Sequence, residues 1–183
     1  MVCNLLYIGS WQRLLESRLK KHLRLAAAVV VLSCMAACGE RSGESAGEAS
    51  AVPTAATLGE QVVVPNAEYL AAAPYATADR ANGARQAQFC RACHALEADG
   101  RHMVGPALHG FFGTRAGSRA GYDYSPVLRD AGFVWTPAAL DAWLIQPGRF
   151  LPGNRMTFAG VSKQSDREDL IAYLLEVTNG SAE

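Results

Sequence analysis

Hydrophobic residues recur with helical spacing near the C-terminal end of the chain. Leu170, Tyr173, Leu174 and Val177 lie at positions i, i+3, i+4 and i+7, which is typical of a helix with one buried face. The run Ser165–Glu168 just before them has the pattern of a capping box. The sequence therefore predicts a helix that opens at this box and ends at the following Asn-Gly pair.

Two further helices are predicted from their start and stop residues. The first runs from about Thr77 or Asp79 into a pair of cysteines, and Gly83 within it is expected to mark a close helix contact, because glycine otherwise weakens a helix. The second begins at Thr136, has proline at its first helical position and ends near Gln146, where a Pro-Gly pair follows. The expected fold is all-α, with three main helices. The long loops between them are unusual for a compact domain unless they wrap a large apolar group.

The N-terminal segment has a different composition. Residues 18–24 are mostly basic, and residues 25–37 are uncharged and mostly Ala, Val and Leu, which is typical of a secretory signal. The five residues around Cys38, Met-Ala-Ala-Cys-Gly, resemble the cleavage box of bacterial lipoproteins, and Cys34 is the second choice. We expect residues 1–38 to be a lipoprotein-like leader whose cysteine is lipidated. Simple cleavage, or retention as an uncleaved anchor, are the alternatives.

The rest of the chain divides into a polar segment and a globular domain. Residues 39–74 are expected to be a flexible tether, although the stretch 61–74 could instead be extended and pack on the domain. Residues 75–183 are enough for one small core. The whole chain has 17 basic and 17 acidic residues, which argues against nucleic-acid binding because such proteins show a basic excess.

Two cysteines and a histidine form the pattern C-x-x-C-H, as Cys90, Cys93 and His94. A redox dithiol would need a βαβ context, a zinc site would need more ligands than His102 and His109 add, and a simple disulfide would leave His94 unexplained. The pattern is a c-type haem attachment signal, in which each thiol adds to one haem vinyl group and the imidazole can bind the iron. We therefore predict one covalent haem c, with His94 as an iron ligand.

A second axial ligand is expected from a methionine. Met103 is only nine residues beyond His94, which makes the opposite face of the ring hard to reach. Met156 follows a Pro-Gly-Asn-Arg loop that can cross that face, so we predict Met156 as the second iron ligand. His102 and His109 are the rival ligands.

Several runs of residues, taken in order, resemble class I cytochromes c, near the mitochondrial and bacterial cytochrome c2 branch. The resemblance covers about residues 83–178. Besides the haem motif, it rests on the runs 104–110 (VGPALHG), 121–125 (GYDYS), 132–135 (GFVW), 152–160 (PGNRMTFAG) and 167–174 (REDLIAYL). It implies a fold of three main helices and loops wrapped around the haem.

The resemblance also implies roles for individual residues. Pro106 would present its carbonyl to the ring N–H of His94 and so fix the tautomer. The remaining expected haem contacts are Tyr124 and Trp135 at the propionates, Trp143 beside Met156, Asn154 where threonine is usual, and Phe158 over the haem edge. Thr114 departs from the pattern, because it stands in the place of a common propionate-side arginine.

These features together favour a periplasmic single-electron carrier. It would be a monomer, held to a membrane by a lipid on Cys38, and would shuttle electrons between respiratory or photosynthetic membrane complexes as its redox partners. His/Met ligation raises the reduction potential, and no second metal cluster or nucleophile–base pair suggests catalysis. The alternatives are an electron-entry haem subunit of an oxidoreductase, and a haem-based gas sensor in which Met156 leaves the iron.

Overall fold

The computed structural model describes residues 53–180, so the expected leader and its cysteines lie outside the described residues. The elements in chain order are η1 (Ala55–Thr57), α2 (Asn66–Ala71), η2 (Tyr75–Thr77), α3 (Arg80–Arg91), α4 (Pro126–Arg129), α5 (Pro137–Ile145), α6 (Pro147–Phe150) and α7 (Gln164–Val177). Within this range the β-structure is a single isolated bridge between Arg115 and Val134. The all-α class is confirmed.

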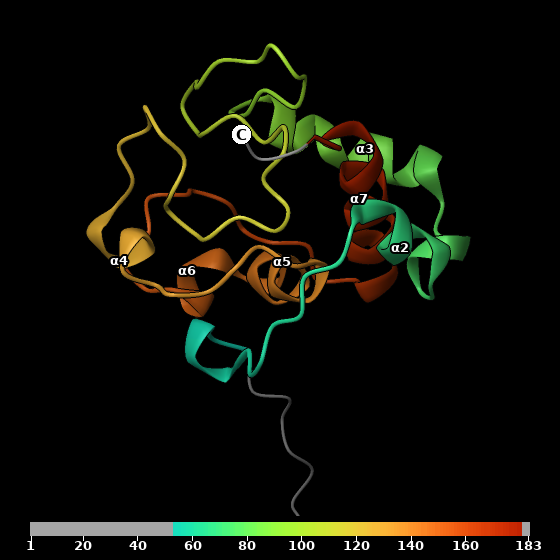
Figure 1. Cartoon of the computed structure of the whole chain (residues 1–183), viewed down its shortest axis with the longest axis horizontal. Helices are drawn as coiled ribbons and strands as arrows, with labels where there is room; N and C mark the ends of the chain where they lie inside the picture. Colours follow the sequence, from blue (N-terminus) through green and yellow to red (C-terminus); the bar gives the residue numbers. More distant parts are fainter. Residues whose placement is uncertain (1–52, 181–183) are drawn as a thin grey trace, which may run out of the picture. The chain divides into compact units, whose positions relative to one another are not determined.

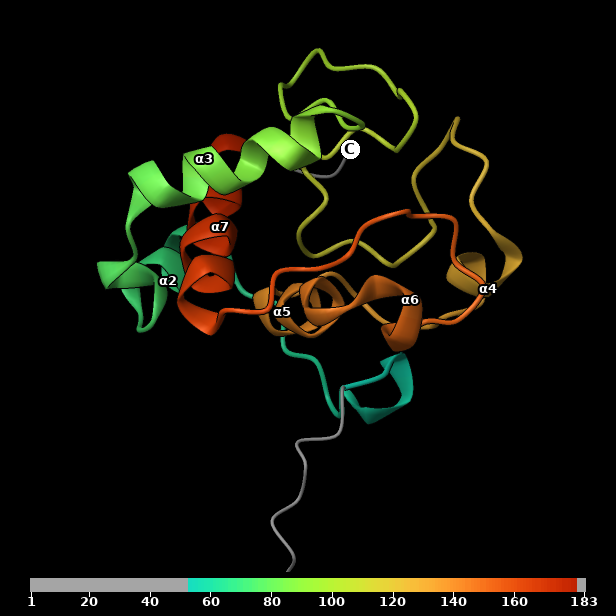
Figure 2. The ribbon, with the colours of Figure 1, turned by 180° about the vertical axis from the view of Figure 1, so that it is seen from behind.

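The two longest helices, α3 and α7, cross on one side of the molecule (Figures 1 and 2). Asp79 caps α3 by accepting a hydrogen bond from the Asn82 backbone N–H at 3.0 Å, as expected of an N-cap aspartate. Gly83 lies at the crossing, where a Cβ atom would stand 2.1 Å from the Asp169 carbonyl oxygen and 2.7 Å from the Tyr173 Cβ. The close helix contact predicted at Gly83 is therefore confirmed.

Helix α5 begins where the sequence predicts. The Thr136 side chain accepts a hydrogen bond from the Ala139 backbone N–H at 3.1 Å, and Pro137 occupies the first turn. Leu140, Trp143 and Leu144 are all buried. Pro147 ends α5 as expected, but the chain then forms the short helix α6 instead of a plain turn.

The start of α7 differs from the expected capping box. The helix begins at Gln164, its N-cap is Lys163, and no side chain caps it. Arg167, in the first turn of the helix, is buried and donates to Asp141 of α5 at 2.8 Å. This inter-helix ion pair sets the position of the first turn in place of a local cap.

Part of the expected tether is packed on the domain. The Gln61 side chain donates to the Val134 carbonyl at 2.7 Å and accepts from the Val134 N–H at 2.8 Å, as a strand partner would. The Asn66 side chain donates to the Leu175 carbonyl at 3.0 Å. Residues 61–74 therefore pack on the domain, which is the alternative that the sequence left open for this stretch, although Asn66–Ala71 form a helix instead of extended chain. None of the helices between residues 53 and 180 is both long and apolar enough to cross a bilayer.

Candidate haem site

A cavity of about 960 Å³ lies between α3, α5, α7 and the loops. All ten residues that the sequence singles out line it: Cys90, Cys93, His94, Pro106, Tyr124, Trp135, Trp143, Asn154, Met156 and Phe158. They come from α3, α5 and three separate loops. This volume is at the upper end of ordinary ligand pockets, so the cavity has room for a large planar group.

The end of α3 positions the cysteine motif. Cys90 lies in the last turn of the helix and Cys93 follows in a turn whose N–H bonds to the Cys90 carbonyl at 3.0 Å. The two cysteines are not joined in a disulfide, and burial raises the pKa of the Cys90 thiol to about 11. Both thiols face the same cavity, so one group inside it can meet both.

His94 is oriented by its neighbours. Its ring Nδ1 lies 2.6 Å from the Pro106 carbonyl oxygen, and this acceptor places the ring hydrogen on Nδ1. Gly105 lies against the ring, where a Cβ atom would be 2.3 Å from the His94 Cε1. Burial lowers the pKa of His94, and the Pro106 bond partly opposes this. The imidazole is therefore held with Nε2 free to bind a metal.

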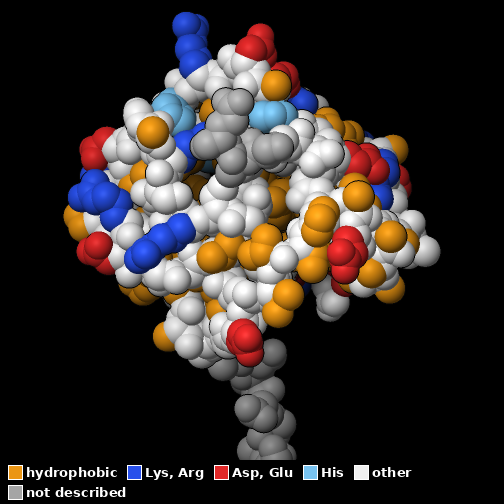
Figure 3. Space-filling view, viewed as in Figure 1, with side chains coloured by type: hydrophobic (Ala, Val, Ile, Leu, Met, Phe, Trp, Pro, Cys, Tyr) orange, Lys and Arg blue, Asp and Glu red, His pale blue; other side chains and the backbone are white. Residues whose placement is uncertain are grey.

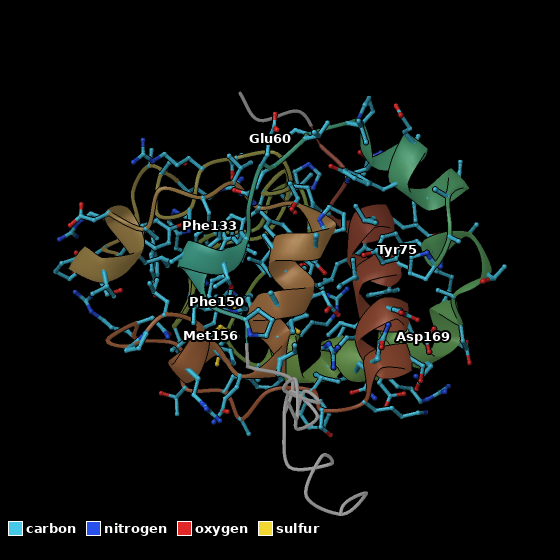
Figure 4. The ribbon with its side chains drawn as sticks, turned by 90° about the horizontal axis from the view of Figure 1, so that it is seen from below. Glu60, Tyr75, Phe133, Phe150, Met156 and Asp169 are labelled. Carbon is cyan, nitrogen blue, oxygen red and sulfur yellow. The ribbon has the colours of Figure 1, made fainter. Side chains whose placement is uncertain are left out.

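Met156 is held in a loop that follows α6. The Trp143 Nε1–H donates to the Met156 sulfur at 3.3 Å, and the Asn154 side-chain oxygen accepts from the Met156 N–H at 2.8 Å. Farther along, Gly160 (φ +101°) approaches the end of α5 so closely that a Cβ would lie 2.1 Å from the Ile145 carbonyl oxygen. In Figure 4, Met156 is seen with Phe150 on the α5–α6 side, away from Asp169 on α7. The loop is thus fixed at both ends.

Of the rival ligands, His102 is engaged in hydrogen bonds and Met103 lies outside the cavity, whereas His109 lines it. His102 Nδ1 accepts from the Ala107 N–H at 3.0 Å, and its Nε2 lies 2.9 Å from the Ala120 carbonyl. His109 lines the cavity, its Nδ1 is buried without a hydrogen-bond partner within residues 53–180, and its ring packs where a Cβ on Gly180 would be 2.2 Å away. Met103 is about half exposed and does not line the cavity. In the part of the chain that the structure describes, no cluster of His, Cys, Asp and Glu could hold a metal ion, so the zinc alternative finds no support.

Several polar residues of the cavity wall were not singled out from the sequence, among them Ser125 and Arg119. The Ser125 hydroxyl is buried and, within residues 53–180, has no hydrogen-bond partner. A buried hydroxyl without a partner is rare and indicates a group that is bound there. Gly105, which leaves room for the His94 ring, and the unpartnered Ser125 hydroxyl both fit a haem that has polar substituents at one end. The GYDYS run contained Ser125, but neither residue belongs to a periodic pattern.

The comparisons with known proteins agree with this geometry. No protein-family model matches the chain. The cytochrome c of Gibberella zeae is 43% identical over 89 residues, which are 49% of this chain and 84% of that protein. The cytochrome c of Kluyveromyces lactis is 36% identical over 105 residues, 57% of this chain and 96% of that protein. The chain belongs to the class I cytochrome c family.

Membership of the cytochrome c family settles the cofactor. Cytochromes c carry one covalently bound haem c with iron, and they are electron-transfer proteins that work with redox partner proteins. The cytochrome c of Trypanosoma brucei brucei, at 47% identity over 75 residues, belongs to the same group of relatives. These relatives match about half of this chain. Ligation by His94 and Met156 stays a prediction.

Proposed function

We propose that this cytochrome c carries single electrons with His94 and Met156 as its two axial iron ligands. The observation that carries the proposal is that both side chains line one cavity and are each held by a hydrogen bond, His94 by Pro106 and Met156 by Trp143. When bound, the haem supplies an iron that changes between ferric and ferrous. Two protein ligands suit electron transfer, because neither has to leave during the reaction.

The protein keeps the two ligands in place in both redox states. The Pro106 carbonyl fixes the His94 tautomer, so the free Nε2 stays available. The Trp143 N–H and the Asn154 side chain restrict the Met156 side chain and backbone. Small rearrangement on electron transfer is the expected consequence. The buried wall of the cavity, with Trp143 and Leu140 among its residues, disfavours the extra charge of the ferric state and so raises the potential.

A reversible redox titration of the haem-loaded protein tests this function. We expect a single one-electron transition, and we expect the ferrous protein to resist carbon monoxide at neutral pH because Met156 occupies the sixth position. Rapid formation of a ferrous carbon monoxide spectrum would contradict the proposal and favour a gas sensor. Tight copurification with a dehydrogenase or oxidase would instead favour an electron-entry subunit.

We also propose that the protein works in the bacterial periplasmic space, anchored as a lipoprotein through Cys38. The basic and apolar runs before Cys38 and the Ala-Ala-Cys-Gly sequence support this. A lipid anchor with a short tether would let the domain meet membrane oxidoreductase complexes without diffusing away. In a bacterial host supplied with a labelled fatty acid, the label should appear on the wild-type protein and on Cys34→Ala but not on Cys38→Ala. Equal labelling of both variants would contradict lipidation at Cys38.

A further inference from the structure

Two loops of the cavity wall, 102–107 and 118–122, are joined by side-chain hydrogen bonds. Tyr122 donates its hydroxyl to the Val104 carbonyl at 2.6 Å. Arg119 donates from Nη1 to the Ala107 carbonyl at 3.2 Å. This bond uses one end of the guanidinium and leaves its other N–H groups without an acceptor in the part of the chain that the structure describes. Arg119 is therefore anchored at the wall but retains donors for another partner.

The charge of Arg119 is not neutralised by any carboxylate among residues 53–180. Seven ion pairs occur there, and none includes Arg119. Of the other arginines outside these pairs, Arg101 and Arg149 do not line the cavity, and Arg115 lines it but is exposed. Arg119 lines the cavity and is partly buried. It is thus a partly buried cation in the cavity wall with no ion-pair partner among residues 53–180, and a bound anion would be stabilised beside it.

Other donors lie at the same end of the cavity. Burial raises the pKa of Tyr124, and the positive charge of Arg119 partly opposes this, so the guanidinium acts on the Tyr124 hydroxyl. Ser125 adds its unbonded hydroxyl. The nearby Asp123 carboxylate is taken up by ion pairs with Arg155 at 3.0 Å and Arg129 at 3.3 Å. Arg119, Tyr124 and Ser125 therefore line the same cavity, and the Ser125 hydroxyl has no partner within residues 53–180.

We propose that Arg119 is the positioning and charge-balancing residue for a haem propionate. This assignment rests on the proposed function. Class I cytochromes c commonly carry an arginine at the place of Thr114, and Thr114 here bonds to the Phe111 carbonyl instead, at 2.7 Å. Arg119 supplies the missing cation from five residues farther along the same loop. Tyr124 and Ser125 complete the donor set around the carboxylate.

The charge of Arg119 then has a defined effect on electron transfer. The ferric haem carries one more positive charge than the ferrous haem, so a nearby cation favours the ferrous state. Loss of Arg119 would also leave the propionate charge uncompensated, which favours the ferric state. Removing Arg119 therefore lowers the reduction potential in two ways: the cation that favours the ferrous state is lost, and the negative propionate is left to favour the ferric state. Coulomb's law at the effective dielectric constant of a protein edge puts the change in the reduction equilibrium at about threefold to tenfold.

The test is the reduction potential of the haem-loaded Arg119→Gln variant, with Arg149→Gln as the matched control. Arg149 is exposed, makes no ion pair among the described residues and does not line the cavity. We expect the glutamine change at 119 to shift the reduction equilibrium about tenfold at most, which is about 59 mV for one electron. The change at 149 should shift it much less. Equal shifts in the two variants would overturn the assignment.

A rescue variant separates the charge of Arg119 from its bond to Ala107. Thr114→Arg combined with Arg119→Gln restores a cation at the same end of the cavity without restoring the Ala107 bond. We expect it to regain most of the lost potential or, where the single variant holds no haem, to regain haem binding. No recovery would show that Arg119 acts only by joining the two loops. A reversible wild-type couple together with this negative result would leave the electron-carrier function standing.

Discussion

The α3–α7 crossing and the loop wall of the haem cavity differ in how their polar groups are satisfied. At the crossing, the Asn82 side chain donates to Asp166 and Asp169, each at 2.9 Å, and Asp169 also accepts from the Asp79 N–H at 2.7 Å. In the wall, the Ser125 hydroxyl is buried without a partner among the described residues. At the crossing, the polar side chains find their hydrogen-bond partners within the protein, whereas in the wall we expect the haem to supply the partner.

The largest expected effect is the loss of the haem itself. The double variant Cys90→Ala/Cys93→Ala removes both attachment points and should leave the 960 Å³ cavity without its contents. Without the haem, the buried apolar side chains of the wall lose their packing partner, and domains are stable by only about 5–15 kcal/mol. We expect the near-ultraviolet circular dichroism of Trp135 and Trp143 to disappear. Retention of that signal with a wild-type melting temperature would show that the wall does not depend on the haem.

The helix crossing should be broken by a single methyl group. Gly83→Ala places a Cβ against the Asp169 backbone, which cannot move without displacing α7. We expect the free energy of unfolding to fall by about 3 kcal/mol, measured by denaturant titration of the haem-loaded protein. Gly148→Ala is the control, because nothing lies within 4 Å of its Cβ position. A similar loss in both variants would mean that the crossing is not tightly packed.

A smaller effect is expected at the ion pair between α5 and α7. The Arg167 side chain is 8% exposed and bonds to Asp141 and to the Val161 and Ser162 carbonyls. Arg167→Gln should lower the free energy of unfolding by about 2 kcal/mol, because Asp141 and two carbonyls lose their donor and Asp141 is partly exposed. Lys163→Gln, whose side chain is 69% exposed, should change it by about 0.5 kcal/mol or less. If both changes have the same effect, Arg167 does not set the start of α7.

The sequence predicted the helices whose ends are marked by local chemistry. Asp79 and Thr136 bond to the first turns of α3 and α5 as their residue types suggest. The start of α7 was placed wrongly at Ser165, because Arg167 is fixed by a partner 26 positions away and not by a local pattern. Helix α2 was missed for the same reason. It has only six residues and is held by Asn66, which bonds to α7.

For the site, all ten residues that spacing and resemblance identified line the cavity, together with others that they did not identify. Cysteine, histidine and methionine are few in this chain, and their spacing is constrained by haem chemistry, so they stand out. Arg119 and Ser125 do not, because arginines and serines are common in loops. Their roles follow from the lack of a carboxylate beside Arg119 and of a hydrogen-bond partner for Ser125 among residues 53–180. Only the three-dimensional structure shows this.

The absorption spectrum of the oxidised protein tests the central claim most directly. Iron bound by a thioether gives a weak charge-transfer band at the red end of the visible spectrum. The account predicts this band in wild type and in Met103→Ala, and its loss in Met156→Ala, while the haem stays covalently attached in all three. A wild-type spectrum without the band at neutral pH, or a band that survives Met156→Ala, would contradict ligation by Met156.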